Sequence, residues 1–236
     1  MNVRTTMSLE KLSVPIAIVI AGGLIAGALY YSNMKTARES AKVATAPLAV
    51  TGEMRPISLD DHIIGNPNAD LILVEYSDTE CPFCKVFHKT LQRMMSEYGE
   101  SGKVAWVYRH FPIDSLHSKA RKESEALECA NELGGPTKFW EYTNLLYATT
   151  NSNNSLDPLE LPKMAKAVGL EVKAFNTCLS SGKYADRVEA DYQDAMRVGG
   201  RGTPHSIIVS KDGTKTPIQG AQPYESVKTI IDALLQ

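Results

Sequence analysis

Residues 71–84 read LILVEYSDTECPFC, and this stretch decides how the chain folds. Its first six residues form an apolar, strand-like run, which the polar turn SDTE separates from two cysteines. Proline after the first cysteine suits the first position of a helix, because its missing N–H would have no partner there. We therefore expect a strand, a turn and a helix that runs from Pro82 to about Tyr98.

The two cysteines of this stretch, Cys81 and Cys84, lie one helical turn apart at the start of the predicted helix. Free backbone N–H groups and the positive end of the helix dipole favour a thiolate over a thiol at such a position. The pattern therefore predicts a redox dithiol, with Cys81 as the nucleophile and Cys84 as the resolving thiol.

A CxxC motif can also be half of a zinc site, which needs four ligands. The other cysteines, Cys129 and Cys178, are isolated from each other and supply no second pair, while His88 supplies only a third ligand. A redox dithiol is therefore the preferred interpretation, and no metal is expected.

The composition is that of an ordinary globular protein with room for one large domain or two small ones. Of 236 residues, 43% are hydrophobic, and 25 Lys and Arg stand against 27 Asp and Glu, which gives a net charge of −2. No basic stripe indicates nucleic-acid binding, so we exclude that class of function.

Residues 12–34 carry no charged side chain and are apolar enough to span a bilayer, which takes roughly 20 residues. A cleaved signal peptide is the competing interpretation, since its apolar core is about 7 to 15 residues long and ends in small residues. This run is longer and ends in Tyr30 and Tyr31, which suit a membrane interface. We therefore predict a cytoplasmic tip at 1–11, a transmembrane signal anchor at 12–34 and a tether at 35–55.

The cysteines decide the predicted orientation, because positive charges lie on both sides of the anchor. Four cysteines, an even number, fit an oxidising compartment better than a reducing cytosol. Cys129 and Cys178 lie in helix-like stretches and are predicted to form a structural disulfide; two buried free thiols or a second redox pair are the alternatives. We therefore expect a single-pass protein of the bacterial cell membrane whose domain lies on the extracytoplasmic, periplasmic side.

Residues 56–236 predict one α/β domain. A second strand is expected at 103–111, which completes a right-handed βαβ unit with the first strand and helix. Residues 116–199 are helical in pattern, and two strands at 205–210 and 214–219 and a closing helix follow them. The order βαβ, helical block, ββα describes a thioredoxin fold with an inserted helical domain.

Five short motifs in this domain together resemble those of the DsbA-like thiol-disulfide oxidoreductases, over roughly residues 56–236. They are Ile64-Gly65-Asn66-Pro67, Glu75-Tyr76-Ser77-Asp78, Cys81-Pro82-Phe83-Cys84, Phe139-Trp140 and Gly202-Thr203-Pro204. The resemblance implies an extracytoplasmic enzyme with a surface-accessible first cysteine and a helical insertion that caps the site. It implies no metal, flavin or nucleotide cofactor.

The resemblance also implies a substrate-binding surface beside the dithiol. Pro204 stands where the family has a cis-proline, and Thr203 before it would then offer backbone groups to an extended substrate chain. Pro82 and Phe83, between the two cysteines, are expected on the same surface.

Glu75 stands six residues before Cys81 (81 minus 75), where thioredoxin-like proteins carry a buried acid. Burial should raise its pKa, so we expect Glu75 to take and return the proton of Cys84. A strand residue that faces solvent is the alternative. His88 and His117 are expected to be exposed rather than to act at the site.

Two positions depart from the best-known member of the family: Phe83 replaces a histidine, and Thr203 replaces a valine before the proline. The missing histidine and the neighbouring Glu80 should raise the pKa of Cys81 relative to that member and make the dithiol less oxidising. We expect an enzyme that introduces disulfides into folding or reduced proteins and is reoxidised by a quinone-linked membrane partner. A reductase or isomerase served by a membrane electron donor, a metal-binding chaperone and an anchored binding module remain as alternatives.

Overall fold

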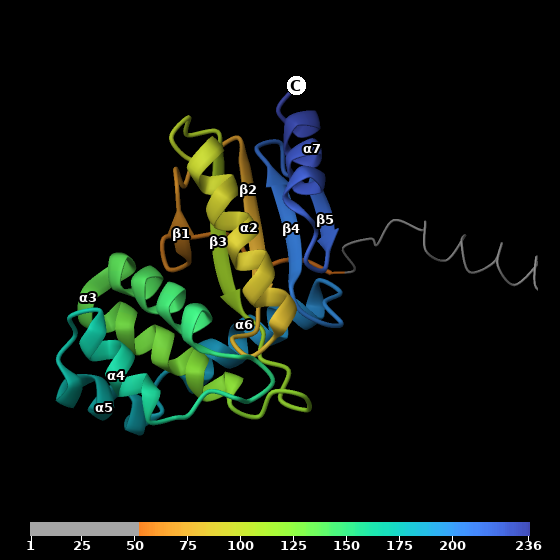
Figure 1. The fold of residues 1–236 in the computed structure, drawn as a ribbon. Coiled ribbons are helices and arrows are strands. Elements are labelled where there is room, and N and C mark those ends of the chain that lie inside the picture. Colours follow the sequence, from red (N-terminus) through yellow and green to blue (C-terminus); the bar gives the residue numbers. More distant parts are fainter. Residues whose placement is uncertain (1–51) are drawn as a thin grey trace, which may run out of the picture. The chain divides into compact units, whose positions relative to one another are not determined.

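A computed structural model describes residues 52–236, which form a five-stranded sheet with helices on both faces (Figure 1). The predicted cytoplasmic tip and signal anchor, residues 1–11 and 12–34, lie outside the described residues. Within residues 52–236, no helix is both long enough and apolar enough to cross a membrane.

The strands stand side by side in the order β1-β3-β2-β4-β5. Their bounds are β1 (His62–Ile64), β2 (Leu71–Ser77), β3 (Val104–His110), β4 (His205–Ser210) and β5 (Lys215–Gln219). The central pair β2 and β3 is parallel, and every other neighbouring pair is antiparallel. The carboxyl end of β2, in the middle of the sheet, therefore leads directly into the two cysteines.

Within residues 52–236, six helices surround this sheet. Their bounds are α2 (Pro82–Tyr98), α3 (Ala120–Thr149), α4 (Glu160–Ala167), α5 (Val172–Ser181), α6 (Ala185–Arg197) and α7 (Tyr224–Leu234). Helices α2 and α7 lie side by side on one face, while α3, α4 and α5 gather at one end of the sheet (Figure 1). The arrangement is the expected thioredoxin fold with a helical insertion.

Helix α3 contains a sharp break at Gly135. Gly135 has a φ of 71° and a ψ of −170°, which interrupt the helical backbone, and Pro136 begins the second half. Glycine suits this backbone because it has no Cβ to clash. Helix α3 therefore consists of two halves that meet at this break.

Strand β1 is an element that the sequence does not predict. Its three residues are too few to show an alternating pattern, and they are placed by antiparallel pairing with β3, with His62 opposite Tyr108. Such short edge strands depend on their neighbours rather than on their own propensity.

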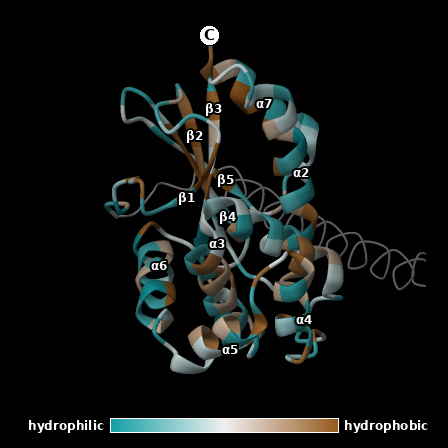
Figure 2. Ribbon diagram, turned by 90° about the vertical axis from the view of Figure 1, so that its left-hand side faces the viewer, coloured by the Kyte–Doolittle hydropathy of each residue, from teal (hydrophilic) through white to brown (hydrophobic). Residues whose placement is uncertain are grey.

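The sheet separates two hydrophobic layers, and its central strands β2 and β3 are correspondingly apolar along most of their length (Figure 2). In β2, Leu71 and Leu73 pack against the layer that contains α2, α3 and α7, whereas Val74 and Tyr76 pack against the layer that contains α6. A strand buried on both faces reads as a nearly continuous apolar run, which is why β2 is recognisable in the sequence.

A buried ion network lies on the α6 face of the sheet. Arg109 of β3, which is fully buried, pairs with Asp61 at 2.9 Å and with Asp194 of α6 at 2.7 Å. The Tyr76 hydroxyl donates to the same Asp194 carboxylate at 2.6 Å. Each buried charge on Arg109 and these aspartates therefore has a hydrogen-bonded partner, as burial of charge requires.

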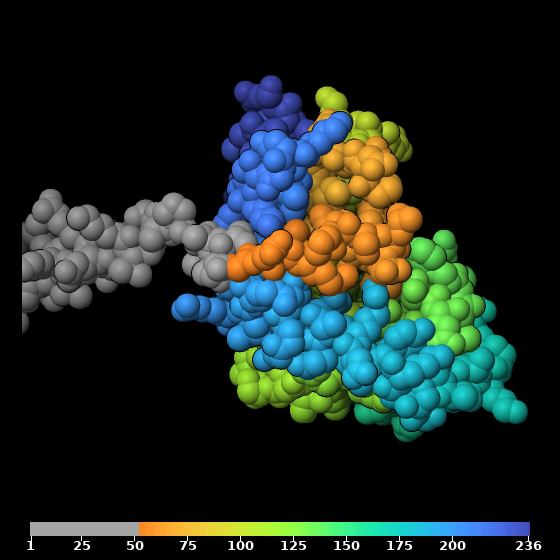
Figure 3. All heavy atoms as spheres, turned by 180° about the vertical axis from the view of Figure 1, so that it is seen from behind, coloured from red at the N-terminus to blue at the C-terminus, as the bar shows by residue number. Residues whose placement is uncertain are grey.

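The folded domain begins before the predicted boundary at residue 56. Met54 is buried, and Arg55 pairs with Asp61 and Asp191, both at 2.8 Å. In the view from behind, the orange segment that starts at residue 52 runs across this face (Figure 3). The last residues of the predicted tether therefore belong to the domain, because they supply an apolar side chain and a cation to this face.

Replacement of Arg109 by methionine tests the network. The variant R109M leaves Asp61 and Asp194 buried without their main cation, so we expect a loss of about 3 to 5 kcal/mol in the free energy of unfolding. Urea denaturation of both proteins measures this loss. The exposed Arg201 provides the control R201M, which should stay within about 0.5 kcal/mol of wild type. An equally small effect of R109M would contradict the assigned role.

Candidate active site

The two cysteines lie at the N-terminal end of α2, directly after the turn that follows β2. Cys81 caps the helix with extended backbone angles, φ −79° and ψ 122°, and Pro82 occupies the first helical position. Both thiols are free, so the structure shows the dithiol form. Cys81 keeps 5% of its surface exposed, whereas Cys84 is fully buried. Cys81 is thus the reachable sulfur of the pair, although it is more recessed than the family resemblance implies.

The surroundings of Cys81 stabilise its thiolate. A hydrogen bond from the Cys84 thiol, followed by those from Thr203 and from the backbone N–H groups of Cys84 and Phe83, lowers the pKa of Cys81 to about 6 from an ordinary 9.0. Burial opposes this shift but is outweighed. At neutral pH, Cys81 is therefore mostly a thiolate, the reactive form in disulfide exchange.

The loop before β4 closes the other side of the Cys81 sulfur. The peptide bond between Thr203 and Pro204 is cis, and the Cys81 Sγ lies 3.4 Å from the backbone oxygen of Thr203. Phe83, with 65% of its surface exposed, stands at the rim. The structure thus brings together the residues predicted for substrate binding and the nucleophile.

Glu75 lies fully buried in β2, not facing solvent. Its carboxyl accepts hydrogen bonds from the Ser77 hydroxyl at 2.8 Å and from the Trp106 indole N–H at 3.1 Å. Burial raises its pKa to about 8, and the nearby charge of Cys81 adds to the shift. Burial also raises the pKa of Cys84 well above 9, and the Glu75 charge contributes to this shift. At neutral pH, Glu75 is therefore a proton donor beneath the dithiol.

A chain of hydroxyl groups, absent from the sequence prediction, extends from Glu75. The Ser77 hydroxyl also contacts the Tyr147 hydroxyl at 2.9 Å, which in turn lies 3.3 Å from that of Tyr108. The Tyr147 hydroxyl also donates to the Asp78 backbone oxygen at 3.3 Å. The sequence does not reveal this role of Tyr147, because helical spacing shows burial but not where a hydroxyl points.

Asp78 and His117 form a second buried pair at the catalytic turn. The Asp78 carboxylate accepts from the His117 Nδ1 at 2.9 Å and from the Ile113 N–H at 2.7 Å, while the Asp78 N–H donates to the Cys84 Sγ at 3.4 Å. The expectation that His117 is exposed is therefore wrong, because Asp78 gives it a buried partner.

His88 is likewise buried, with 2% of its surface exposed, contrary to the sequence prediction. Its Nε2 bonds to the Asn144 side chain at 2.7 Å, and its ring lies against Trp106 and Tyr147. Burial lowers the pKa of His88 to about 4, so the ring is neutral at physiological pH. A single histidine on a helix does not show which face packs against the core.

The other two cysteines, Cys129 of α3 and Cys178 of α5, form a disulfide with an S–S distance of 2.01 Å. The bond lies within the helical insertion and fixes α5 against α3. Of the pairings that four cysteines allow, the structure therefore contains this bond and leaves Cys81 and Cys84 as the free dithiol.

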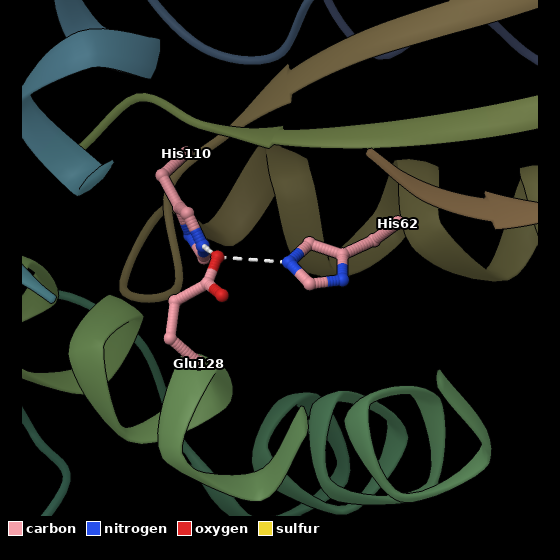
Figure 4. A group of neighbouring side chains, drawn as sticks. All are labelled: His62, His110 and Glu128. Atoms are coloured by element: carbon pink, nitrogen blue, oxygen red, sulfur yellow. Dashed lines mark hydrogen bonds and ion pairs between the residues drawn. The ribbon is translucent and has the colours of Figure 1, made fainter. Parts of the chain in front are cut away.

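A further buried cluster joins His62 of β1, His110 of β3 and Glu128 of α3 (Figure 4). The Glu128 Oε1 lies 2.8 Å from the Nε2 of each histidine and accepts from the Arg187 Nε at 2.7 Å. Nitrogen and oxygen ligands of one zinc ion would stand roughly 3.3 Å apart, given metal–ligand bonds of about 2.0 to 2.2 Å. The distances and the arginine therefore describe a hydrogen-bonded structural cluster that ties the insertion to the sheet.

Known proteins and protein families are similar to the part of the chain that the structure describes. The family model described as Thioredoxin matches residues 58–233. The curated Na(+)/H(+) antiporter NhaA 1 of Mycolicibacterium gilvum is 32% identical over 161 residues, which cover 67% of this chain and 25% of that protein. An antiporter of Salinispora tropica is 28% identical over 205 residues, 85% of this chain and 30% of that protein. The chain thus spans less than a third of the length of these relatives.

Solved structures give a more complete match. DsbA2 of Pseudomonas aeruginosa has a TM-score of 0.63 and 25% identity, covering 76% of this chain and 97% of that one. BdbD of Bacillus subtilis has a TM-score of 0.67 and 22% identity, covering 79% and 98%. The family match and the fold therefore lead to one conclusion: the chain belongs to the thioredoxin family, and its domain has the fold of these DsbA-like structures.

Proposed function

We propose that the enzyme introduces disulfides into reduced or folding proteins on the extracytoplasmic side of a membrane. The observation that supports this direction best is the stabilised thiolate of Cys81, whose pKa is lowered to about 6. A stabilised thiolate favours the reduced enzyme and so makes the disulfide form a stronger oxidant. The pKa lies between those of thioredoxin, about 7, and DsbA, about 3.5, which fits an oxidant of moderate strength.

The exchange begins when a substrate thiolate attacks the Sγ of Cys81 in the Cys81–Cys84 disulfide. The S–S bond breaks, Cys84 leaves as a thiolate, and Glu75 supplies its proton, because Cys84 has the higher pKa when buried. A second substrate thiolate then attacks the substrate sulfur of the mixed disulfide, and Cys81 leaves as a stabilised thiolate. Two electrons thus pass from the substrate dithiol to the enzyme dithiol.

Turnover requires a partner that removes these two electrons. A quinone-linked membrane protein is the proposed reoxidant, and an electron donor takes its place if the enzyme works as a reductase or isomerase. In reoxidation, the Cys81 thiolate attacks the partner disulfide and forms a mixed disulfide with the partner. The Glu75 carboxylate then accepts the proton of Cys84, so that the Cys84 sulfur can attack Cys81, re-form the Cys81–Cys84 disulfide and release the partner as a dithiol.

Equilibration with glutathione buffers measures the direction of exchange. We expect a reduction potential clearly above the about −270 mV of thioredoxin, and oxidised enzyme should restore disulfides to a reduced, unfolded protein. The variant C81S should lose this activity, whereas C84S should accumulate a mixed disulfide between Cys81 and the substrate. A potential near that of thioredoxin would reject the oxidase and favour the reductase.

The pH dependence of stability tests Glu75. Because its pKa is about 8 in the folded protein and about 4.5 in the unfolded chain, folding takes up a proton between these pH values and stability falls as pH rises across this range. The glutamine of E75Q does not titrate, so near pH 7 the free energy of unfolding of this variant should exceed that of wild type by on the order of 3 kcal/mol. At pH 4 the two free energies should be equal. Urea denaturation of the reduced proteins measures the gain.

The exposed Glu100 provides a matched control for this change. The variant E100Q should follow wild type at every pH, while E75Q should also release Cys84 more slowly in single-turnover exchange. A stability difference for E75Q that does not change with pH would show that the carboxyl does not titrate as proposed.

The proposed membrane attachment rests on the uncharged stretch at 12–34 and, for the oxidising side, on the Cys129–Cys178 disulfide. The full chain should remain with the membrane after alkaline carbonate washing, and a chain without residues 1–34 should not. If the protein expressed from the full sequence is instead recovered in the soluble fraction and is shortened at its N-terminus, residues 12–34 belong to a cleaved signal peptide.

A further inference from the structure

Glu80 directly precedes the nucleophile, is fully buried and is bonded to the segment between α3 and α4, residues 150–159. Its backbone oxygen accepts a hydrogen bond from the Asn153 N–H at 2.7 Å. Its carboxylate Oε1 accepts from the Thr150 hydroxyl and from the Leu156 N–H, both at 3.2 Å. Glu80 is thus the residue through which this segment holds the catalytic turn.

The α3–α4 segment has an unusual backbone. Ser152, Asn153 and Asn154 have φ angles of 67°, 55° and 63°, all in the left-handed region. Three successive non-glycine residues adopt this conformation only where their surroundings fix it. Because Asn153 is bonded to Glu80, the contact with the catalytic turn is one of the interactions that fix this backbone.

A second buried acid, Glu123 in the first turn of α3, accompanies Glu80. It has 2% of its surface exposed, and its Oε2 accepts from the Thr79 hydroxyl at 2.7 Å. The other carboxylate oxygen of Glu80, Oε2, is buried and receives no hydrogen bond from an amide, hydroxyl or amine of residues 52–236. The Glu123 carboxyl lies within hydrogen-bonding reach of Glu80, so a protonated Glu123 is the donor that Glu80 lacks.

We propose that Glu123 shares its proton with the Glu80 carboxylate through a hydrogen bond, and that this proton keeps the α3–α4 segment on the catalytic turn. Glu80 is then a positioning residue for Cys81. The role of Cys81 rests on the proposed function, whereas the shared proton and the attachment of the segment do not.

The charges around the pair agree with a retained proton. Ionisable groups near the pair come from the catalytic turn, α2, α3 and the loop before α3: Asp78, Lys85, Tyr142, His117 and Lys119. Asp78 adds negative charge, which its partner His117 offsets, and the two lysines donate to backbone oxygens of the segment rather than to the pair. Burial, with smaller effects from Glu80 and Asp78, raises the pKa of Glu123 to about 8.

Loss of the proton in alkaline solution has two consequences. Two carboxylates then repel each other in a buried site, so the segment should separate from Glu80. The additional negative charge beside the nucleophile should also raise the pKa of Cys81, because a like charge disfavours the thiolate.

Hydrogen exchange of the reduced full-length chain, followed by mass spectrometry from about pH 6 to 10 and corrected for intrinsic exchange, tests the proposal. In wild type, the peptide covering residues 150–159 should lose at least about tenfold in protection in the alkaline range. In E123Q, the glutamine amide still donates to Glu80 but has no proton to lose, so protection should persist. The control E125Q, on the same helix, should behave as wild type.

A second variant keeps the test decisive if E123Q does not fold. Removal of the Thr79 hydroxyl in T79V takes away a hydrogen bond that lowers the pKa of Glu123, so the loss of protection should move to higher pH. An unchanged transition in E123Q or T79V, or no transition in wild type, would overturn the proposal. Failure of the proposed function would instead appear as absent exchange activity with the transition intact.

Discussion

The N-terminus of α2 stabilises one negative charge, the thiolate of Cys81, and the other parts of the site are arranged around this charge. Strand β2 fixes where the helix begins, the Cys84 thiol donates to the thiolate, and Thr203 closes the opposite side. Because these donors stabilise only the reduced enzyme, their strength sets the direction of exchange. Phe83 contributes its backbone N–H but, unlike a histidine, no side-chain donor, which is consistent with an intermediate pKa.

Buried carboxyl groups on the two faces of the sheet differ in their partners and in their ionisation. On the α6 face, Asp61 and Asp194 meet Arg109, so the carboxylates are ionised, hydrogen-bonded and structural. On the catalytic side, Glu75 and Glu123 lie buried with no arginine or lysine partner among residues 52–236, and burial raises their pKa values to about 8. Such acids lower the stability of the folded state at neutral pH, but Glu75 thereby retains a proton close to the two thiols.

The sequence predicts the elements whose patterns are local. The dithiol, the apolar run of β2 and the helical block follow from residues close together in the chain, and the spacing of Glu75 from Cys81 follows from the family resemblance. What it misses depends on partners far along the chain: the pairing of β1 with β3, the burial of His117 against Asp78, and the contact of Glu80 with residues 150–156. Glu80 was expected to act on Cys81 by its charge alone, because a sequence does not show that a carboxylate is bonded elsewhere.

The position of Met54 and Arg55 bears on how the domain is isolated. A truncated protein that starts at residue 58, where the family match begins, would lack both side chains. Such a protein would expose the apolar surface under Met54 and remove one cation from Asp61 and Asp191. Low solubility or a low melting temperature of that fragment would then reflect where it was cut, and a start at or before residue 52 preserves the native edge of the domain.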